Sequence, residues 1–205
     1  MKQIKKHKHL ISAYIVSFFA IAFTLLPITW LFMLSIKSKG ETFTKPPKWI
    51  FDPTIKNYVK LWDNDLFKDT FFNSIYITII SIVLSVTIAL FAAYALKIYK
   101  IKFKTAFMQW LLLAYMLPEF LFVLPMFTIY QTLGIYDTYL GMAIIYQVHV
   151  LPFSIWMLRS FLEEIPKEID DAAIIDGCGP IQAIFKIYLP LIIPGIVATA
   201  ILNGI

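Results

Sequence analysis

Long stretches without a basic residue constrain this chain more than any other feature of its sequence. No lysine or arginine lies between Leu10 and Ile36, between Phe71 and Leu96, or between Thr105 and Leu158. A helix that crosses the hydrocarbon core of a bilayer needs about 20 consecutive, mostly apolar residues. The 205 residues are 60% hydrophobic and only 15% charged, whereas soluble domains carry roughly 25% charged residues. We therefore expect an integral membrane protein.

The apolar runs predict an all-α, polytopic transmembrane helical bundle in one domain, residues 1–205. Five spans are expected, over residues 10–36, 72–96, 106–130, 139–158 and 187–205. The first run is longer than the apolar region of a signal peptide, which has about 7–15 residues, so we expect it to be retained. The third run is interrupted by Pro118 and Pro125.

The lysines beside the spans predict the orientation of the chain. The N-terminal tail and the 97–104 loop contain four lysines each, whereas the 131–138 link contains none. Because positively charged short loops stay in the cytoplasm, we expect the N-terminus and the 97–104 loop inside. Segment 159–186 would also be cytoplasmic, and segment 37–70 would lie outside in spite of its seven lysines. The net charge of +5 comes from these lysines and does not indicate nucleic-acid binding.

The last residues of the sequence, 196–205, are still mostly apolar and no polar tail follows them. A chain end in the middle of a bilayer would hold backbone groups and a carboxylate away from water, which is costly. Either the last span is short and ends at Asn203, or the chain is truncated, and we expect truncation.

Several classes of protein are disfavoured by what the sequence lacks. It has no phosphate-binding loop of the type G-x-x-x-x-G-K-[ST], so the chain is not an ATPase. It also has neither an H-E-x-x-H nor a G-x-S-x-G motif, and its single cysteine, Cys178, excludes a cysteine-based metal cluster. We predict no catalytic, cofactor-binding or metal-binding residues.

Segment 163–176 differs from the rest of the chain because it contains six acidic residues and one lysine. Pro166 suits the first turn of a helix and Gly177 suits a C-terminal stop, so a short helix is predicted over residues 166–176. At helical spacing, one side of it carries Ile169, Ala172, Ala173 and Asp176. The segment can be a solvated loop, but the adjacent alanines favour a helix pressed against another protein.

The residues of this segment match a known signature. Asp171-Ala-Ala-Ile-Ile-Asp-Gly177, then nine residues, then Ile187-Tyr-Leu-Pro190 resembles the EAA signature of ABC-importer permeases. In that signature E-A-A is followed by three residues, G, nine residues and I-x-L-P. The spacing agrees throughout, and the departure is Asp171 in place of glutamate, which keeps the charge but shortens its reach.

Other segments resemble the carbohydrate-uptake branch of these permeases. They are Pro53–Tyr58, Phe72–Ser74, Gly134–Gly141 and Arg159–Glu168. The nearest resemblance is to the maltose-transporter permease family, second-subunit type, whose members usually have six spans. The resemblance implies the ABC-importer permease fold and inward transport of a sugar or oligosaccharide by alternating access, and the five spans expected here agree with truncation.

The resemblance also implies partners. In the family, the EAA segment is a helix that docks on a cytoplasmic ATPase, and a second permease subunit, two ATPase subunits and an extracytoplasmic substrate-binding protein complete the importer. The docking residues would be Asp171, Ala172, Ala173, Asp176 and Gly177. Leu189 and Pro190 would fix the joint to the fifth span. The chain would lie among the lipids of a bacterial cytoplasmic membrane, bind no cofactor, and depend on ATP used by its partners.

Candidates for the transport path are few. Glu119 is the one acid well inside an apolar run, and such groups usually face a bundle interior or water. Tyr115, Tyr146 and Gln147 are further candidates, since sugar sites combine aromatic and polar groups. Three alternatives stay open: a permease for a peptide, polyamine or phosphate ester; a membrane enzyme that uses Glu119 and His149; and an ion-coupled secondary transporter.

Overall fold

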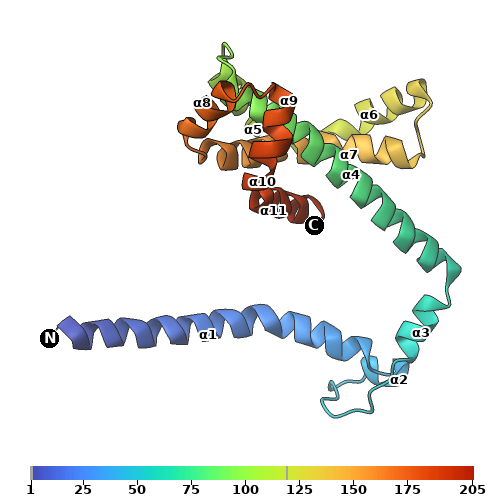
Figure 1. Ribbon diagram of the computed structural model, residues 1–205. Helices are drawn as coiled ribbons and strands as arrows, with labels where there is room; N and C mark the ends of the chain where they lie inside the picture. The colour runs from blue at the N-terminus through green and yellow to red at the C-terminus, as the bar shows by residue number, and fades with distance from the viewer. Residues whose placement is uncertain (1, 119) are drawn as a thin grey trace. The chain divides into compact units, whose positions relative to one another are not determined.

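Most of the chain that can be described is helical. The computed structural model describes residues 2–118 and 120–205, with side chains described from residue 13 onward, and no strand occurs among them (Figure 1). The helices are α1 (Lys2–Ser35), α2 (Lys39–Thr42), α3 (Lys56–Trp62), α4 (Asp65–Ile98), α5 (Lys104–Met116), α6 (Phe120–Leu133), α7 (Tyr139–Glu163), α8 (Lys167–Ile175), α9 (Pro180–Ala183), the π-helix η1 (Ile184–Tyr188), α10 (Leu189–Leu191) and α11 (Ile193–Asn203). The predicted all-α class is confirmed.

Three helices are long and apolar enough to cross a membrane, over Ala13–Ser35, Asp65–Ile98 and Tyr139–Glu163. Two further pairs of helices pass the same test together but are bent: α5 with α6, and Pro180–Leu191 with α11, the second pair by 80°. The described residues thus provide three to five spans, and the predicted five are reached when each bent pair is one span.

Proline has different effects in different apolar helices. Leu117, which precedes Pro118, is extended and ends α5, because the proline ring disfavours helical dihedrals at the preceding residue. Pro125 and Pro152 instead lie inside α6 and α7. Prolines are tolerated in membrane helices where neighbouring groups satisfy the freed carbonyl. The predicted third span is therefore broken at Pro118 but not at Pro125.

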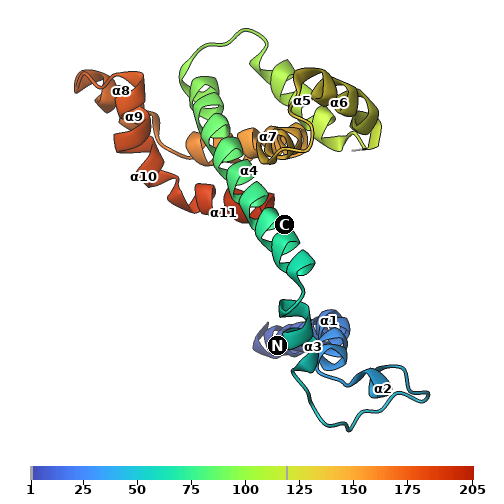
Figure 2. The ribbon, with the colours of Figure 1, turned by 90° about the vertical axis from the view of Figure 1, so that its right-hand side faces the viewer.

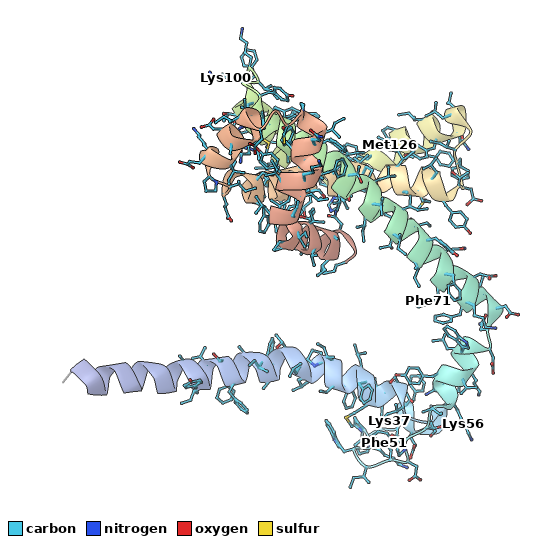
Figure 3. The ribbon with its side chains drawn as sticks, viewed as in Figure 1. Lys37, Phe51, Lys56, Phe71, Lys100 and Met126 are labelled. Atoms are coloured by element: carbon cyan, nitrogen blue, oxygen red, sulfur yellow. The ribbon has the colours of Figure 1, made fainter. Side chains whose placement is uncertain are left out.

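The chain forms two compact units, Met1–Thr70 and Phe71–Ile205. In the first, the loop that follows α1 folds around Lys37, whose side chain is buried. Its ammonium donates to the Lys48 carbonyl at 2.5 Å and lies 4.8 Å from the centre of the Phe51 ring (Figure 3). Asn57 in α3 donates to the Ser35 and Lys37 carbonyls at 2.9 and 2.7 Å. The segment predicted only as polar is thus an ordered structure.

The second unit is organised by α4 and α7. Helices α5 and α11 both pack on α7, while α8, α9 and α10 lie on one side of α4 and α5 and α6 lie on the other (Figure 2). Gly195 in α11 faces Phe161 in α7 so closely that an added Cβ would lie 2.5 Å from the ring. Small residues at such interfaces let two helix backbones approach each other.

A polar cluster joins three helices of this unit. The side-chain amide of Asn203 in α11 donates to Ser85 in α4 at 2.8 Å and to Ser154 in α7 at 2.9 Å. Both serines are fully buried. Hydrogen bonds of this kind hold membrane helices together, because apolar side chains are buried equally well against lipid tails and against another helix.

Candidate functional site

Helix α8 coincides with the segment that resembles the EAA signature. Pro166 caps it, Glu168 and Asp170 lie in its first turn, and acidic residues there interact favourably with the helix dipole. At its other end Gly177 has φ of +68°, a conformation that glycine adopts at little cost. Its N–H donates to the Ile174 carbonyl at 3.0 Å, and the Cys178 N–H to the Ala173 carbonyl at 3.0 Å. These two bonds form a Schellman motif, which ends the helix within one residue of the predicted position.

The two sides of α8 have different surroundings. Ala173 is buried and Asp170 is half-buried, so this side faces the rest of the unit. The opposite side carries Asp171, Ala172 and Ile175, and Ile175 is 84% exposed. Of the four residues expected on one side of the helix, Ala173 is buried within the chain, whereas Ile169, Ala172 and Asp176 are exposed. Asp170, which was not singled out from the sequence, faces the rest of the unit because it has partners there.

Those partners are Lys97 at the end of α4 and Tyr188 in η1. The Lys97 ammonium lies 3.0 Å from the Asp170 carboxylate, and the Tyr188 hydroxyl donates to the same carboxylate at 2.5 Å. Lys97 also donates to the Ile165 carbonyl at 3.2 Å and lies 5.1 Å from the centre of the Tyr188 ring. Three elements therefore meet at one ion pair.

The predicted joint, Leu189 and Pro190, lies in α10 between η1 and α11. Leu189 packs against the core of the unit, whereas Pro190 is exposed. The bend of 80° falls between Leu191 and Ile193, with Ile192 buried at the break. The π-helix that precedes the joint was not predicted. Single π-helical turns often occur at functional sites.

Part of the predicted transport path lines a cavity of about 560 Å³. Tyr146 and His149 of α7 line this cavity, together with Met126 of α6, labelled in Figure 3. Tyr115 does not line it, but its ring stacks on His149, with 4.9 Å between the ring centres. The polar groups of the lining are Ser74, Thr78, Ser81, Tyr146, His149 and Asn203. Hydroxyl, imidazole and amide groups around an aromatic ring can bind a polyhydroxylated solute.

Gln147 faces a different cavity of about 440 Å³, which is mostly apolar. Its amide nitrogen donates to the carbonyls of Ser81 and Ala143 at 3.2 and 2.8 Å. Among the described residues, its buried amide oxygen and the Ser81 hydroxyl have no hydrogen-bond partner. Such groups are costly unless water or a ligand reaches them. Glu119 lies outside the described residues, and those residues contain no group of acids, histidines or cysteines suited to a metal.

The chain is similar to proteins of one transport family. Residues 85–205 match the family described as the inner membrane component of binding-protein-dependent transport systems. The sulfoquinovosyl glycerol transport system permease protein SmoH of Agrobacterium fabrum is 32% identical over 87% of this chain and 63% of its own length. The trehalose transport system permease protein SugB of Mycobacterium tuberculosis is 36% identical over 89% of this chain and 66% of its own length. The chain spans a little less than two thirds of the length of both relatives.

A solved structure has a similar fold. The crystal structure of a bacterial ABC transporter involved in the import of the acidic polysaccharide alginate aligns with a TM-score of 0.76 at 23% identity. The alignment covers 97% of this chain and 70% of that one. The matched family region contains α8, its Schellman motif and the joint, so the resemblance to ABC-importer permeases is confirmed. The chain is a multi-pass membrane protein that belongs to the family of binding-protein-dependent transport system inner membrane components, a family of transport components rather than of enzymes.

Proposed function

We propose that this chain is the membrane-spanning permease subunit of an ATP-driven importer that moves a sugar or oligosaccharide inward by alternating access. Its partners are a second permease subunit, two ATPase subunits and an extracytoplasmic substrate-binding protein. The membrane is a bacterial cytoplasmic membrane, with the N-terminus and α8 on the cytoplasmic side. The chain binds no cofactor, because the partner subunits hydrolyse the ATP.

One observation carries this proposal: α8 is held by its own chain on one side and is free on the other. The inner side is anchored through Asp170 and Ala173, while Asp171, Ala172 and Ile175 face outward. Ala172 is small and lies beside the acidic Asp171 and the large aliphatic Ile175, so a complementary cleft of a partner can approach this surface closely. Asp171, Ala172, Asp176 and Gly177 are all exposed, so they are accessible to an ATPase, whereas Ala173 supports the helix from behind.

A carbohydrate is the solute class best supported. The two relatives named above are permeases of transport systems for sulfoquinovosyl glycerol and for trehalose. The larger cavity combines Tyr146 and His149 with serine and threonine hydroxyls, which suits a solute rich in hydroxyl groups better than a polyamine or a phosphate ester. Within the described part of that lining there is no acidic, lysine or arginine side chain.

The proposal is tested by tagging the full-length gene product and purifying it in mild detergent. We expect a P-loop ATPase and a second EAA-type permease to co-purify, identified by mass spectrometry. Recovery of the chain alone, under conditions that keep a control importer whole, would contradict the proposal. A stand-alone membrane enzyme would keep its activity in that state, whereas a permease would transport nothing.

A pair of substitutions at Gly177 tests the docking role of α8. Gly177→Asp adds a negative charge to an exposed, already acidic surface. Gly177→Asn adds a side chain of nearly the same shape as aspartate but without the charge, and asparagine tolerates the positive φ of this position as well as aspartate does. We expect Gly177→Asp to lower both ATPase co-purification and uptake at least tenfold while membrane insertion is unchanged, and Gly177→Asn to change them less than threefold. Unimpaired uptake in Gly177→Asp would remove the docking role from this segment.

A further inference from the structure

The ion pair of Lys97 and Asp170 is much better protected from water than the other ion pairs described in the second unit. The Lys97 side chain is 8% exposed and that of Asp170 18%. By contrast, Lys104 lies 3.5 Å from Glu163 with side chains 27% and 45% exposed. An exposed pair contributes little, whereas a charge left buried by removal of its partner is strongly destabilised. Lys97 and Asp170 are therefore held together.

Among the described residues, the pair with Lys97 is the only ion pair that α8 makes. Its ammonium is bound to Asp170 in the first turn of α8 and to the Ile165 carbonyl just before that helix. Besides the ion pair, α8 has one buried residue, Ala173, whose small side chain has little surface to pack against the rest of the unit. Among the described contacts, Lys97 is thus the side chain that joins α8 and Ile165, just before it, to α4.

Tyr188 of η1 joins Lys97 and Asp170, and these three residues form one cluster. It is 1% exposed, its hydroxyl binds Asp170, and its ring lies 5.1 Å from that of Tyr94 in α4. Asp170 accordingly contacts the end of α4 and the last residue of η1 at the same time. Through this one carboxylate, α8 contacts both elements.

We infer that Lys97 is a positioning residue that fixes α8 to α4 through Asp170 and Tyr188, so that movement of α8 is transmitted to the membrane-spanning part of the chain. The inference rests on the proposed function, in which the ATPases displace α8. The exposed side of α8 would contact the ATPase. On the side of α8 that packs on the rest of the chain, Lys97, Asp170 and Tyr188 would transmit the movement of α8 to α4 and η1.

The test uses the complete importer purified in lipid nanodiscs, with Cys178→Ser as background. Spin labels are placed at Lys167→Cys in α8 and Tyr99→Cys beyond α4, both exposed positions. Pulsed electron paramagnetic resonance then gives the distribution of distances between them, without nucleotide and with magnesium, ATP and vanadate. Lys97→Met keeps the length of the side chain but removes its charge, Lys97→Arg keeps the charge, and Lys104→Met is the matched control.

We expect the unsubstituted protein to give a narrow distribution that nucleotide does not shift, because α8 and the end of α4 move together. Lys97→Met should widen the nucleotide-free distribution at least twofold and make it shift with nucleotide, although the ATPases still co-purify. Lys97→Arg should restore both properties, and Lys104→Met should behave as the unsubstituted protein. A distribution in Lys97→Met that stays narrow and that nucleotide does not shift would overturn the inference. If the unsubstituted protein recruits no ATPase, the proposed function fails, and the nucleotide-free width still decides whether Lys97 positions α8.

A second variant covers the case in which Lys97→Met does not accumulate in the membrane. Tyr188→Phe removes only the hydroxyl that binds Asp170 and keeps the buried ring. We expect a distribution of intermediate width and a nucleotide shift at least twofold smaller than that of Lys97→Met. An unchanged width and shift in this variant would count against the cluster as the link between α8 and η1.

Discussion

At the scale of single residues, Gly195 shows how little space separates α11 from α7. An added Cβ would meet Cγ and Cδ2 of Phe161 at 2.5 Å and its Cβ at 3.1 Å. The Cβ of Phe161 is fixed to the backbone of α7, so the ring alone cannot turn away and the helices have to separate. Overpacking of this kind costs about 1–3 kcal/mol.

We therefore expect Gly195→Ala to lower the free energy of unfolding by about 1–3 kcal/mol, measured by denaturant titration of the purified protein in detergent. Gly40→Ala is the control, because an added Cβ at Gly40 has no atom within 4 Å. Equal stabilities of the two variants would show that α11 packs on α7 less closely than the structure has it.

The residues of the candidate site differ in how far sequence alone could identify them. Gly177 could be predicted, because the end of a helix depends on its nearest neighbours and few residues tolerate positive φ. Lys97 could not be, because its partner carbonyl at Ile165 is 68 residues away and nothing local marks the pair. In the sequence, Lys97 is one of four lysines of a basic loop, and the orientation of the chain in the membrane accounts for such lysines. Its burial results from the folded structure.

At the scale of elements, the cluster of Asn203, Ser85 and Ser154 joins α11 to α4 and α7. Replacing Asn203 with leucine removes both donated bonds and leaves two buried hydroxyls without that partner. We expect a loss of stability of about 0.6–1.7 kcal/mol, between the average and the largest values found for hydrogen bonds between membrane helices. The measurement is the same denaturant titration.

A matched control for Asn203→Leu is Thr24→Val in α1, whose hydroxyl binds only carbonyls of its own helix among the hydrogen bonds described. It should leave stability within about 0.5 kcal/mol, as expected of substitutions that break no contact between elements. If Asn203→Leu proved as mild as this control, the cluster would be incidental to the packing of α11.

The helices themselves could be predicted because apolar runs of sufficient length have almost no other stable form in a bilayer. Their ends were harder to place: α4 begins at Asp65 and α7 continues to Glu163, beyond the apolar runs, because a helix continues into water where polar side chains permit it. Proline gave mixed information, since Pro118 marks a break and Pro125 does not. The π-helix η1 has no signature in its residues.

At the scale of the whole molecule, the proposed orientation has a direct test in a background of Cys178→Ser. Lys100→Cys lies in the basic loop after α4, labelled in Figure 3, and Tyr136→Cys lies in the link that has no lysine. In intact spheroplasts, a membrane-impermeant maleimide should label position 136, and position 100 should react at least tenfold more after permeabilisation. Labelling in the opposite order would reverse the orientation of the chain.

The outward face of α8 has a consequence for the life of the protein in the cell. Ile174 and Ile175 are 72% and 84% exposed, and Ile181 in the next helix is 68% exposed. Aliphatic patches of this kind, when no partner covers them, are what chaperones and proteases act on. If the chain is a permease subunit as proposed, we expect copies made in excess of the ATPase to be degraded, so that the scarcer subunit sets the number of finished importers.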